Sequence, residues 1–173
     1  MKFEKDFVIM KKVLFSLFLI CAFVNLALSQ SADPQPGSAI PAFKMMQTDG
    51  RNFTDKDIPK NKPVVLIYFA PDCDHCMKLM DELFKKIHQF NGATIVMVSF
   101  VQPKDVAWFE RKYQTAKYAN IKVGTEGTTY VLRKFYRLDK TPFTAVYNKK
   151  GKMAFSYKNE TPVNEMLARF KKL

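Results

Sequence analysis

Two long apolar runs, at residues 63–70 and 93–101, restrict the possible folds of this chain more than any other feature. They read "PVVLIYFA" and "ATIVMVSFV", and neither alternates with polar residues. That pattern is typical of strands buried on both faces of a sheet. Between the runs, apolar side chains recur every three or four positions, which predicts an amphipathic helix from about Asp74 to Asn91. Strand, helix and strand in this order predict a parallel β-α-β unit covered by helices.

The remaining chain continues the alternation of strands and helices. Asp49 and Gly50 provide a turn signal for a small N-terminal hairpin. Further elements are predicted at residues 103–119 (helix), 121–123 (strand), 128–138 (helix), 143–148 and 152–158 (hairpin) and 161–173 (helix). We therefore expect an α/β fold in which helices flank a central mixed sheet and a β-hairpin extends the N-terminal side. Trp108, on the helix at 103–119, is expected to pack in the core, with recognition of a partner as the alternative.

The first residues predict export rather than a folded element. Lys11 and Lys12 precede an apolar run at 13–28, which is shorter than the about 20 residues that span a bilayer. Basic residues, a short apolar core and small residues are typical of a secretory signal peptide, here residues 1–29, cleaved before Gln30. An uncleaved anchor and a lipoprotein attached through Cys21 are the alternatives. Residues 30–41 then predict a linker, and residues 42–173 the folded domain.

Charge and cysteine content exclude several classes of protein. The formal net charge is +12, but no run of five or more like charges occurs and no nucleic-acid motif accompanies the lysines. We therefore expect no nucleic-acid partner, and contact with a membrane only through the signal segment or an uncleaved anchor. Once Cys21 leaves with the signal peptide, Cys73 and Cys76 are the only cysteines of the domain. Disulfide-rich secreted domains carry several pairs, so this domain depends on an ordinary hydrophobic core.

Cys73 and Cys76 form a C-x-x-C motif that could hold a metal, form a structural disulfide or act as a redox pair. Structural zinc takes four ligands, and His88 lies about 18 Å along the predicted helix from Cys76. A disulfide across so short a loop stabilises little, because stabilisation grows with loop length. A redox pair fits best, because a helix N-terminus stabilises a thiolate at Cys73 while Cys76 lies one turn later on the apolar face.

The motif in its context resembles the thioredoxin superfamily. The resemblance rests on "VVLIYFAPDCDHC" (64–76), "KTPF" (140–143) and "AVYNKKGKM" (145–153), and covers about residues 38–173. The nearest branch is the secreted bacterial TlpA/ResA-like thiol–disulfide oxidoreductases, the redoxin branch. The resemblance implies a thioredoxin-like fold and a cis peptide bond before Pro142, facing the cysteines. It also implies that the backbone of Thr141 pairs with an extended substrate beside Cys73.

The chain departs from the family pattern around the cysteines. A buried acid of thioredoxin is matched by Ile67, an acid of ResA-like proteins by Leu79, and the usual tryptophan before the first cysteine by Asp72. The usual buried proton acceptor is therefore absent at both family positions. We expect His75 to favour the Cys73 thiolate, whereas Asp72 and Asp74 oppose it by like-charge repulsion. Asp74 could instead cap the helix.

These observations predict an exported thiol–disulfide oxidoreductase in the periplasm or facing the cell envelope. Cys73 would attack a disulfide of a protein substrate and Cys76 would release the mixed disulfide, with no metal or other cofactor. The resemblance implies a membrane electron donor of the DsbD/CcdA type. The direction, reductase or oxidase and isomerase, stays open. The alternatives are a binding or redox-sensing module without turnover and a thiol peroxidase, against which Ala70 weighs, since peroxiredoxins have a threonine there.

Overall fold

The computed structural model describes residues 33–173, so the predicted signal peptide, residues 1–29, lies outside the described residues. Within residues 33–173, seven strands form one sheet in the order β2-β1-β5-β4-β3-β6-β7. The strands are β1 (Lys44–Met46), β2 (Asn52–Thr54), β3 (Val64–Tyr68), β4 (Thr94–Ser99), β5 (Ile121–Thr125), β6 (Phe143–Tyr147) and β7 (Met153–Lys158). The helices are α2 (Asp74–Lys85), α3 (Pro103–Tyr113), α4 (Val131–Phe135) and α5 (Val163–Phe170).

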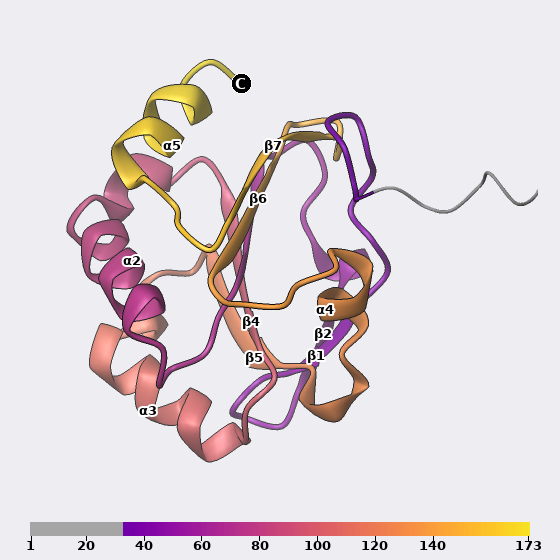
Figure 1. Cartoon of the computed structure of the whole chain (residues 1–173). Coiled ribbons are helices and arrows are strands. Elements are labelled where there is room, and N and C mark those ends of the chain that lie inside the picture. Colours follow the sequence, from indigo (N-terminus) through magenta and orange to yellow (C-terminus); the bar gives the residue numbers. More distant parts are fainter. Residues whose placement is uncertain (1–32) are drawn as a thin grey trace, which may run out of the picture. The chain divides into compact units, whose positions relative to one another are not determined.

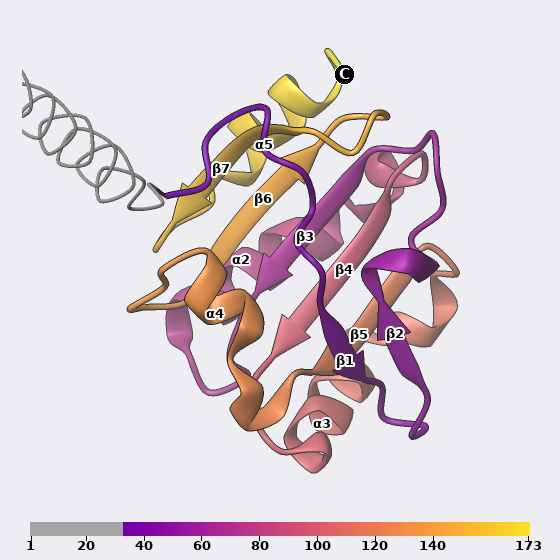
Figure 2. The ribbon, with the colours of Figure 1, turned by 90° about the vertical axis from the view of Figure 1, so that its right-hand side faces the viewer.

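The sheet is mixed, as the sequence predicts. Strands β3, β4 and β5 are parallel, and β6, β7 and β1 run antiparallel to their neighbours. Figure 2 shows β3 and β4 side by side, pointing the same way. The predicted N-terminal hairpin is β1 and β2, and Met46 of β1 pairs with Thr125 of β5. The hairpin therefore extends the central sheet instead of forming a separate unit.

A different core covers each face of the sheet. Along β3, Val65 and Ile67 belong to the core under α2, α3 and α5, whereas Leu66 and Tyr68 belong to the core on the other face. This alternation follows from the two-residue period of a strand. Figure 1 shows α2, α3 and α5 on one side of the sheet, with α4 and the β1–β2 hairpin on the other. The continuous apolar run is explained by a strand buried on both faces.

All four predicted helices are shorter than expected, and the helix predicted at 161–173 is α5, Val163–Phe170. In the other three, the backbone turns at residues that carry no glycine or proline signal. Helix α2 ends at Lys85 and is followed by a 3₁₀ turn, Ile87–Phe90, which keeps its apolar side chains in the core. Gln114 takes the left-handed conformation (φ 50°) and ends α3. Tyr130 (φ 50°) precedes α4 in the same conformation, so the helix predicted at 128–138 contracts to Val131–Phe135.

The N-terminal part of the domain begins earlier than predicted. Residues 33–41, most of the segment predicted as a linker, lie along β7. The Gly37 N–H donates to the Met153 carbonyl and the Met153 N–H donates to the Ser38 carbonyl, both at 2.8 Å. Ala39 bridges Lys152 in antiparallel fashion. This segment therefore adds backbone pairing to the outer strand of the sheet, a pairing that composition alone does not indicate.

Gly124 on β5 lies where another backbone passes too close for a side chain. A Cβ atom there would lie 2.7 Å from the Met46 carbonyl oxygen and 3.0 Å from Met45 Cγ. We expect Gly124→Ala to lower the free energy of unfolding by about 1–3 kcal/mol in urea titrations, since the hairpin must move away. Gly92→Ala is the matched control, because nothing lies within 4 Å of its added Cβ. Equal stabilities of the two variants would contradict this close packing.

Candidate active site

The two cysteines lie where β3 passes into α2. Cys73 is the N-cap residue of α2 and Cys76 lies in its first turn. The Cys73 N–H donates to the Ala70 carbonyl (3.2 Å), which closes the turn after the strand, and the Met77 N–H donates to the Cys73 carbonyl (2.9 Å). Both cysteines are free thiols; Cys73 is partly exposed and Cys76 is fully buried. The sequence-based placement of an accessible and a shielded thiol agrees with this geometry.

The environment separates the acidities of the two thiols. Partial burial raises the pKa of Cys73, but hydrogen bonds from the Cys76 and Thr141 side chains and from backbone N–H groups of the helix start outweigh it. The pKa of Cys73 therefore lies below its ordinary value of 9.0. Burial raises the pKa of Cys76 to about 12. At neutral pH the first thiol of the motif therefore ionises more readily, and the second keeps its proton.

Thr141 and Pro142 directly precede β6, and Thr141 contacts Cys73. The Thr141–Pro142 peptide bond is cis, in agreement with what the family resemblance implies. The protonated Cys73 thiol donates to the Thr141 carbonyl oxygen at 3.5 Å. On the other side of this bond, the Asn159 N–H donates to the Pro142 carbonyl at 2.9 Å. Cys73 and Thr141, which are far apart in the sequence, are therefore in contact.

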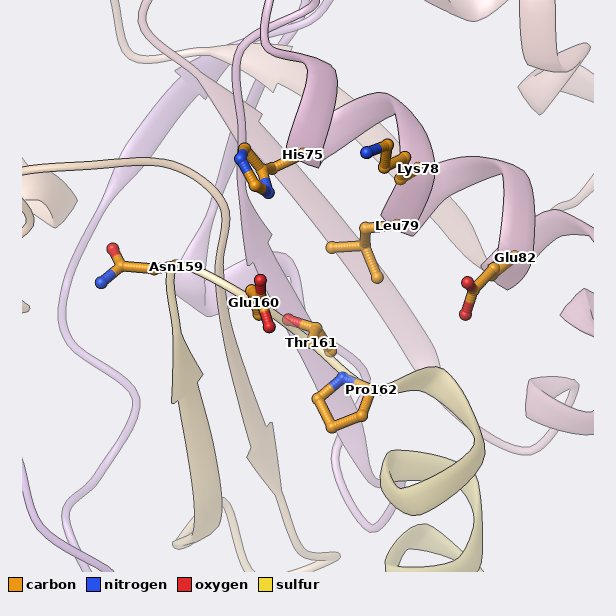
Figure 3. Close-up of a pocket in the computed structure, with 8 residues that line it drawn as sticks. All are labelled: His75, Lys78, Leu79, Glu82, Asn159, Glu160, Thr161 and Pro162. Atoms are coloured by element: carbon orange, nitrogen blue, oxygen red, sulfur yellow. The ribbon is translucent and has the colours of Figure 1, made fainter.

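The polar residues around the cysteines lie on the surface of the domain. Asp72, Asp74 and His75 are all exposed. Asp74 is the first residue of α2 and Cys73 is its N-cap, so the suggestion that Asp74 caps the helix is wrong. His75 lines a pocket of about 250 Å³ between α2 and residues 159–162 (Figure 3). A role of these three side chains in tuning the pKa of Cys73 remains a prediction.

The structure shows a buried acid that the sequence did not single out. Glu126 is 5% exposed, and its carboxylate accepts hydrogen bonds from the Tyr68 hydroxyl (2.8 Å) and the Leu132 N–H (2.9 Å). Tyr68 belongs to the core on the face of the sheet opposite Cys76. Glu126 therefore secures the start of α4 and does not replace the acids missing at Ile67 and Leu79, both of which are buried and apolar on the cysteine side.

Trp108 does not pack in the core, so the prediction that it does is wrong. Val106 and Phe109 take the buried positions of α3, and Trp108, on its outer side, is 46% exposed. It lines a pocket with Asp72 and Asp105, beside the cysteine motif. The spacing of the apolar residues within the helix could have shown that Trp108 lies on its outer side.

Within residues 33–173, no three His, Cys, Asp or Glu side chains come together as a metal site would require.

A mixed sheet, a C-x-x-C dithiol at the start of a helix and a cis peptide bond between Thr141 and Pro142 are the features of a thioredoxin-like protein. The family comparison agrees: residues 36–169 match the AhpC/TSA family, and the chain belongs to that family. The assignment to the thioredoxin superfamily and to a thioredoxin-like α/β fold is thereby confirmed. No curated protein matches this chain in sequence. The TlpA/ResA-like branch remains a prediction.

Solved structures share the fold at low sequence identity. A thiol peroxidase from Chromobacterium violaceum has a TM-score of 0.69 at 11% identity, with 82% of this chain and 88% of that chain covered. A secreted disulfide oxidoreductase of Mycobacterium tuberculosis has a TM-score of 0.64 at 19% identity, covering 76% and 96%. The thioredoxin domain of a thiol–disulfide oxidoreductase from Bacteroides vulgatus has a TM-score of 0.65 at 20% identity, covering 79% and 97%. At these identities the likeness establishes the fold alone.

Proposed function

We propose that this protein is an exported thiol–disulfide oxidoreductase that exchanges disulfides with protein substrates through Cys73 and Cys76. The observation that carries the proposal is the contrast between the two thiols. Cys73 is accessible with a lowered pKa, and Cys76 is buried with a pKa raised to about 12. A nucleophile that attacks and a shielded thiol that reacts second are what stepwise disulfide exchange requires.

The exchange takes place in two steps with a balanced transfer of electrons. The Cys73 thiolate attacks one sulfur of the substrate disulfide, and the other substrate sulfur leaves as a thiolate and takes a proton. Cys76 then gives up its proton and attacks the Cys73 sulfur, which releases the second substrate thiol. Two electrons have passed to the substrate, and the protein holds a Cys73–Cys76 disulfide. The reverse sequence oxidises a substrate dithiol.

Thr141 and Pro142 supply a position for the substrate chain. The Thr141 carbonyl lies 3.5 Å from the Cys73 sulfur, so an extended substrate that pairs with this backbone brings its own sulfur to the nucleophile. Backbone pairing is independent of side-chain identity, so this contact orients many sequences equally well. Selectivity among protein substrates must therefore come from other surfaces near Cys73.

Export and a membrane electron donor complete the proposal. Support for export comes from the basic, apolar and small residues in order along 1–29. After one reaction the protein holds a disulfide, and it needs electrons before it can reduce another substrate. A membrane protein of the DsbD/CcdA type would supply them outside the cytoplasm. Among residues 33–173, no helix has the length and hydropathy needed to cross a bilayer.

Cys76→Ser is expected to convert the protein into a trap for its substrate. Without the second thiol, the mixed disulfide at Cys73 is not resolved, so a complex with a disulfide-containing protein such as oxidised insulin accumulates. Mass spectrometry and non-reducing electrophoresis measure it. Cys73→Ser is the matched control, because the remaining thiol is buried and protonated. Equal amounts of complex with both variants would contradict the assigned roles.

Thiol peroxidase activity is the second candidate, favoured by the match to the AhpC/TSA family. Peroxide reduction would convert the Cys73 thiolate to a sulfenic acid with release of water, and Cys76 would then form the disulfide. Ala70 provides no hydroxyl group near the thiolate, in contrast to the threonine expected there in peroxiredoxins. Consumption of hydrogen peroxide in the presence of dithiothreitol, compared with insulin reduction, distinguishes the two reactions.

A further inference from the structure

We propose that a pocket beside Cys73 binds a cationic side chain, arginine or lysine, of the protein substrate close to its reactive disulfide. This inference rests on the proposed function and adds a substrate preference to it. We call the site the Trp108 pocket; its lining residues are Pro71, Asp72, Val101, Asp105 and Trp108. Its volume is about 370 Å³, which is within the range of pockets that hold small ligands.

The Trp108 pocket lies within one residue of the nucleophile. Asp72 directly precedes Cys73, and consecutive Cα atoms are about 3.8 Å apart. The other wall comes from Val101, after β4, and from the first turns of α3. The pocket thus opens at the carboxyl ends of two adjacent parallel strands, where ligands of α/β folds commonly bind. A substrate whose sulfur reaches Cys73 can place a neighbouring side chain in it.

The lining chemistry selects a cation. Asp72 and Asp105 contribute two carboxylates, and none of the lining residues is cationic, although the whole chain carries a net charge of +12. Trp108 contributes an indole that is 46% exposed. The indole already attracts a cation of this chain, since the Lys112 ammonium lies 5.3 Å from its centroid. Arginine suits such a site because its guanidinium pairs with carboxylates and stacks on aromatic rings.

The helix start explains only part of this arrangement. Asp105 lies in the first turn of α3, where a carboxylate stabilises the helix by interacting with its dipole. That role requires neither an exposed tryptophan nor a second carboxylate from a different loop. The pocket on the other side of the motif, around His75, differs in charge: Lys78, Glu82 and Glu160 give it both signs (Figure 3). The Trp108 pocket is therefore the one that discriminates by charge.

Two matched peptides test the preference. Both carry a cysteine as its mixed disulfide with thionitrobenzoate, followed by Gly-Arg in one peptide and Gly-Gln in the other. The reduced protein releases the chromophore when Cys73 attacks, and the second-order rate constant is measured at low ionic strength. We expect the arginine peptide to react about tenfold faster, the sum of a cation–π contact and a partly screened ion pair. Asp105→Asn and Trp108→Leu should reduce the ratio to about twofold or less.

A control variant and a second readout make the test independent of turnover. Glu82→Gln removes one carboxylate away from the Trp108 pocket and should keep the full ratio. Trp108 is the single tryptophan of the chain, so its fluorescence reports occupancy of the pocket. N-acetylarginine amide should change this fluorescence in the wild-type protein and not in Asp105→Asn. The isosteric, neutral N-acetylcitrulline amide should have at most a small effect.

The outcomes separate the two proposals. Equal rates for both peptides in the wild-type protein would overturn the cation pocket and leave the exchange reaction intact. If neither peptide reacts faster with the wild-type protein than with Cys73→Ser, the proposed function is wrong. The fluorescence titration then tests the cation pocket independently of the exchange reaction. A response to the arginine amide that Asp105→Asn abolishes would support the pocket. Identical responses to the arginine and citrulline amides would refute it.

Discussion

Replacing Cys73 with serine is expected to lower the rate of insulin reduction to that of the uncatalysed reaction with dithiothreitol, a loss of about 1,000-fold or more. The reason lies in the site: Cys73 is the accessible thiol with the lowered pKa, and the remaining thiol is fully buried. A serine hydroxyl stays protonated at neutral pH and does not attack a disulfide sulfur. The measurement is the turbidity of reduced insulin over time.

Cys76→Ser provides the control for this loss. It keeps the nucleophile, so the reduced variant, mixed with insulin in the absence of dithiothreitol, should still release substrate thiol in an amount equal to the protein before the reaction stops. Thermal unfolding of both variants shows whether the fold is intact. Insulin reduction by Cys73→Ser at the wild-type rate would refute the assignment of the nucleophile, whatever the behaviour of the other variant.

Alkylation at pH 7 is expected to modify Cys73 and to leave Cys76 unmodified. A thiol with a pKa of about 12 is ionised to only about one part in 10⁵ at pH 7, and the Cys76 side chain is also shielded from solvent. The Cys73 thiolate is favoured at the helix start, so the ratio of the two rates should exceed about 1,000-fold. Mass spectrometry after brief exposure to iodoacetamide measures the two rates.

The pH dependence of this alkylation has a defined sign. Since only the thiolate reacts, the rate at Cys73 should rise about tenfold for each pH unit below its pKa and become constant above it. Because the pKa is lowered, the plateau should begin below pH 9.0, the ordinary value. A rate that still rises beyond pH 9.0, or equal labelling of both cysteines, would show that the helix start does not activate Cys73.

The sequence predicts the central part of the fold because burial on both faces of a strand leaves an unmistakable pattern. The runs at 63–70 and 93–101 became β3 and β4, and the helix between them begins at Asp74, as expected. The dithiol was placed correctly for the same reason, since a motif between a buried strand and an amphipathic helix can lie only at the carboxyl end of the sheet.

The features that the sequence did not predict depend on contacts between distant segments. Gln114 and Tyr130 adopt left-handed conformations without a glycine, so the ends of α3 and α4 have no local signal. Residues 33–41 have the composition of a linker, yet their backbone pairs with β7. Trp108 is apolar, but its place on the outer side of α3 is decided by Val106 and Phe109. Tertiary packing, rather than composition, determines each of these positions.

The reduction potential of the Cys73–Cys76 couple distinguishes a redox enzyme from a binding module with inert cysteines. The protein is equilibrated with glutathione buffers of increasing oxidised fraction, and the dithiol and disulfide forms are separated after acid quenching. We expect the whole population to convert reversibly between the two forms, with the two-electron dependence of about 30 mV per tenfold change in the ratio of disulfide to dithiol. A chain that stays a dithiol in oxidised glutathione, or that stops at a glutathione adduct of Cys73, would contradict it.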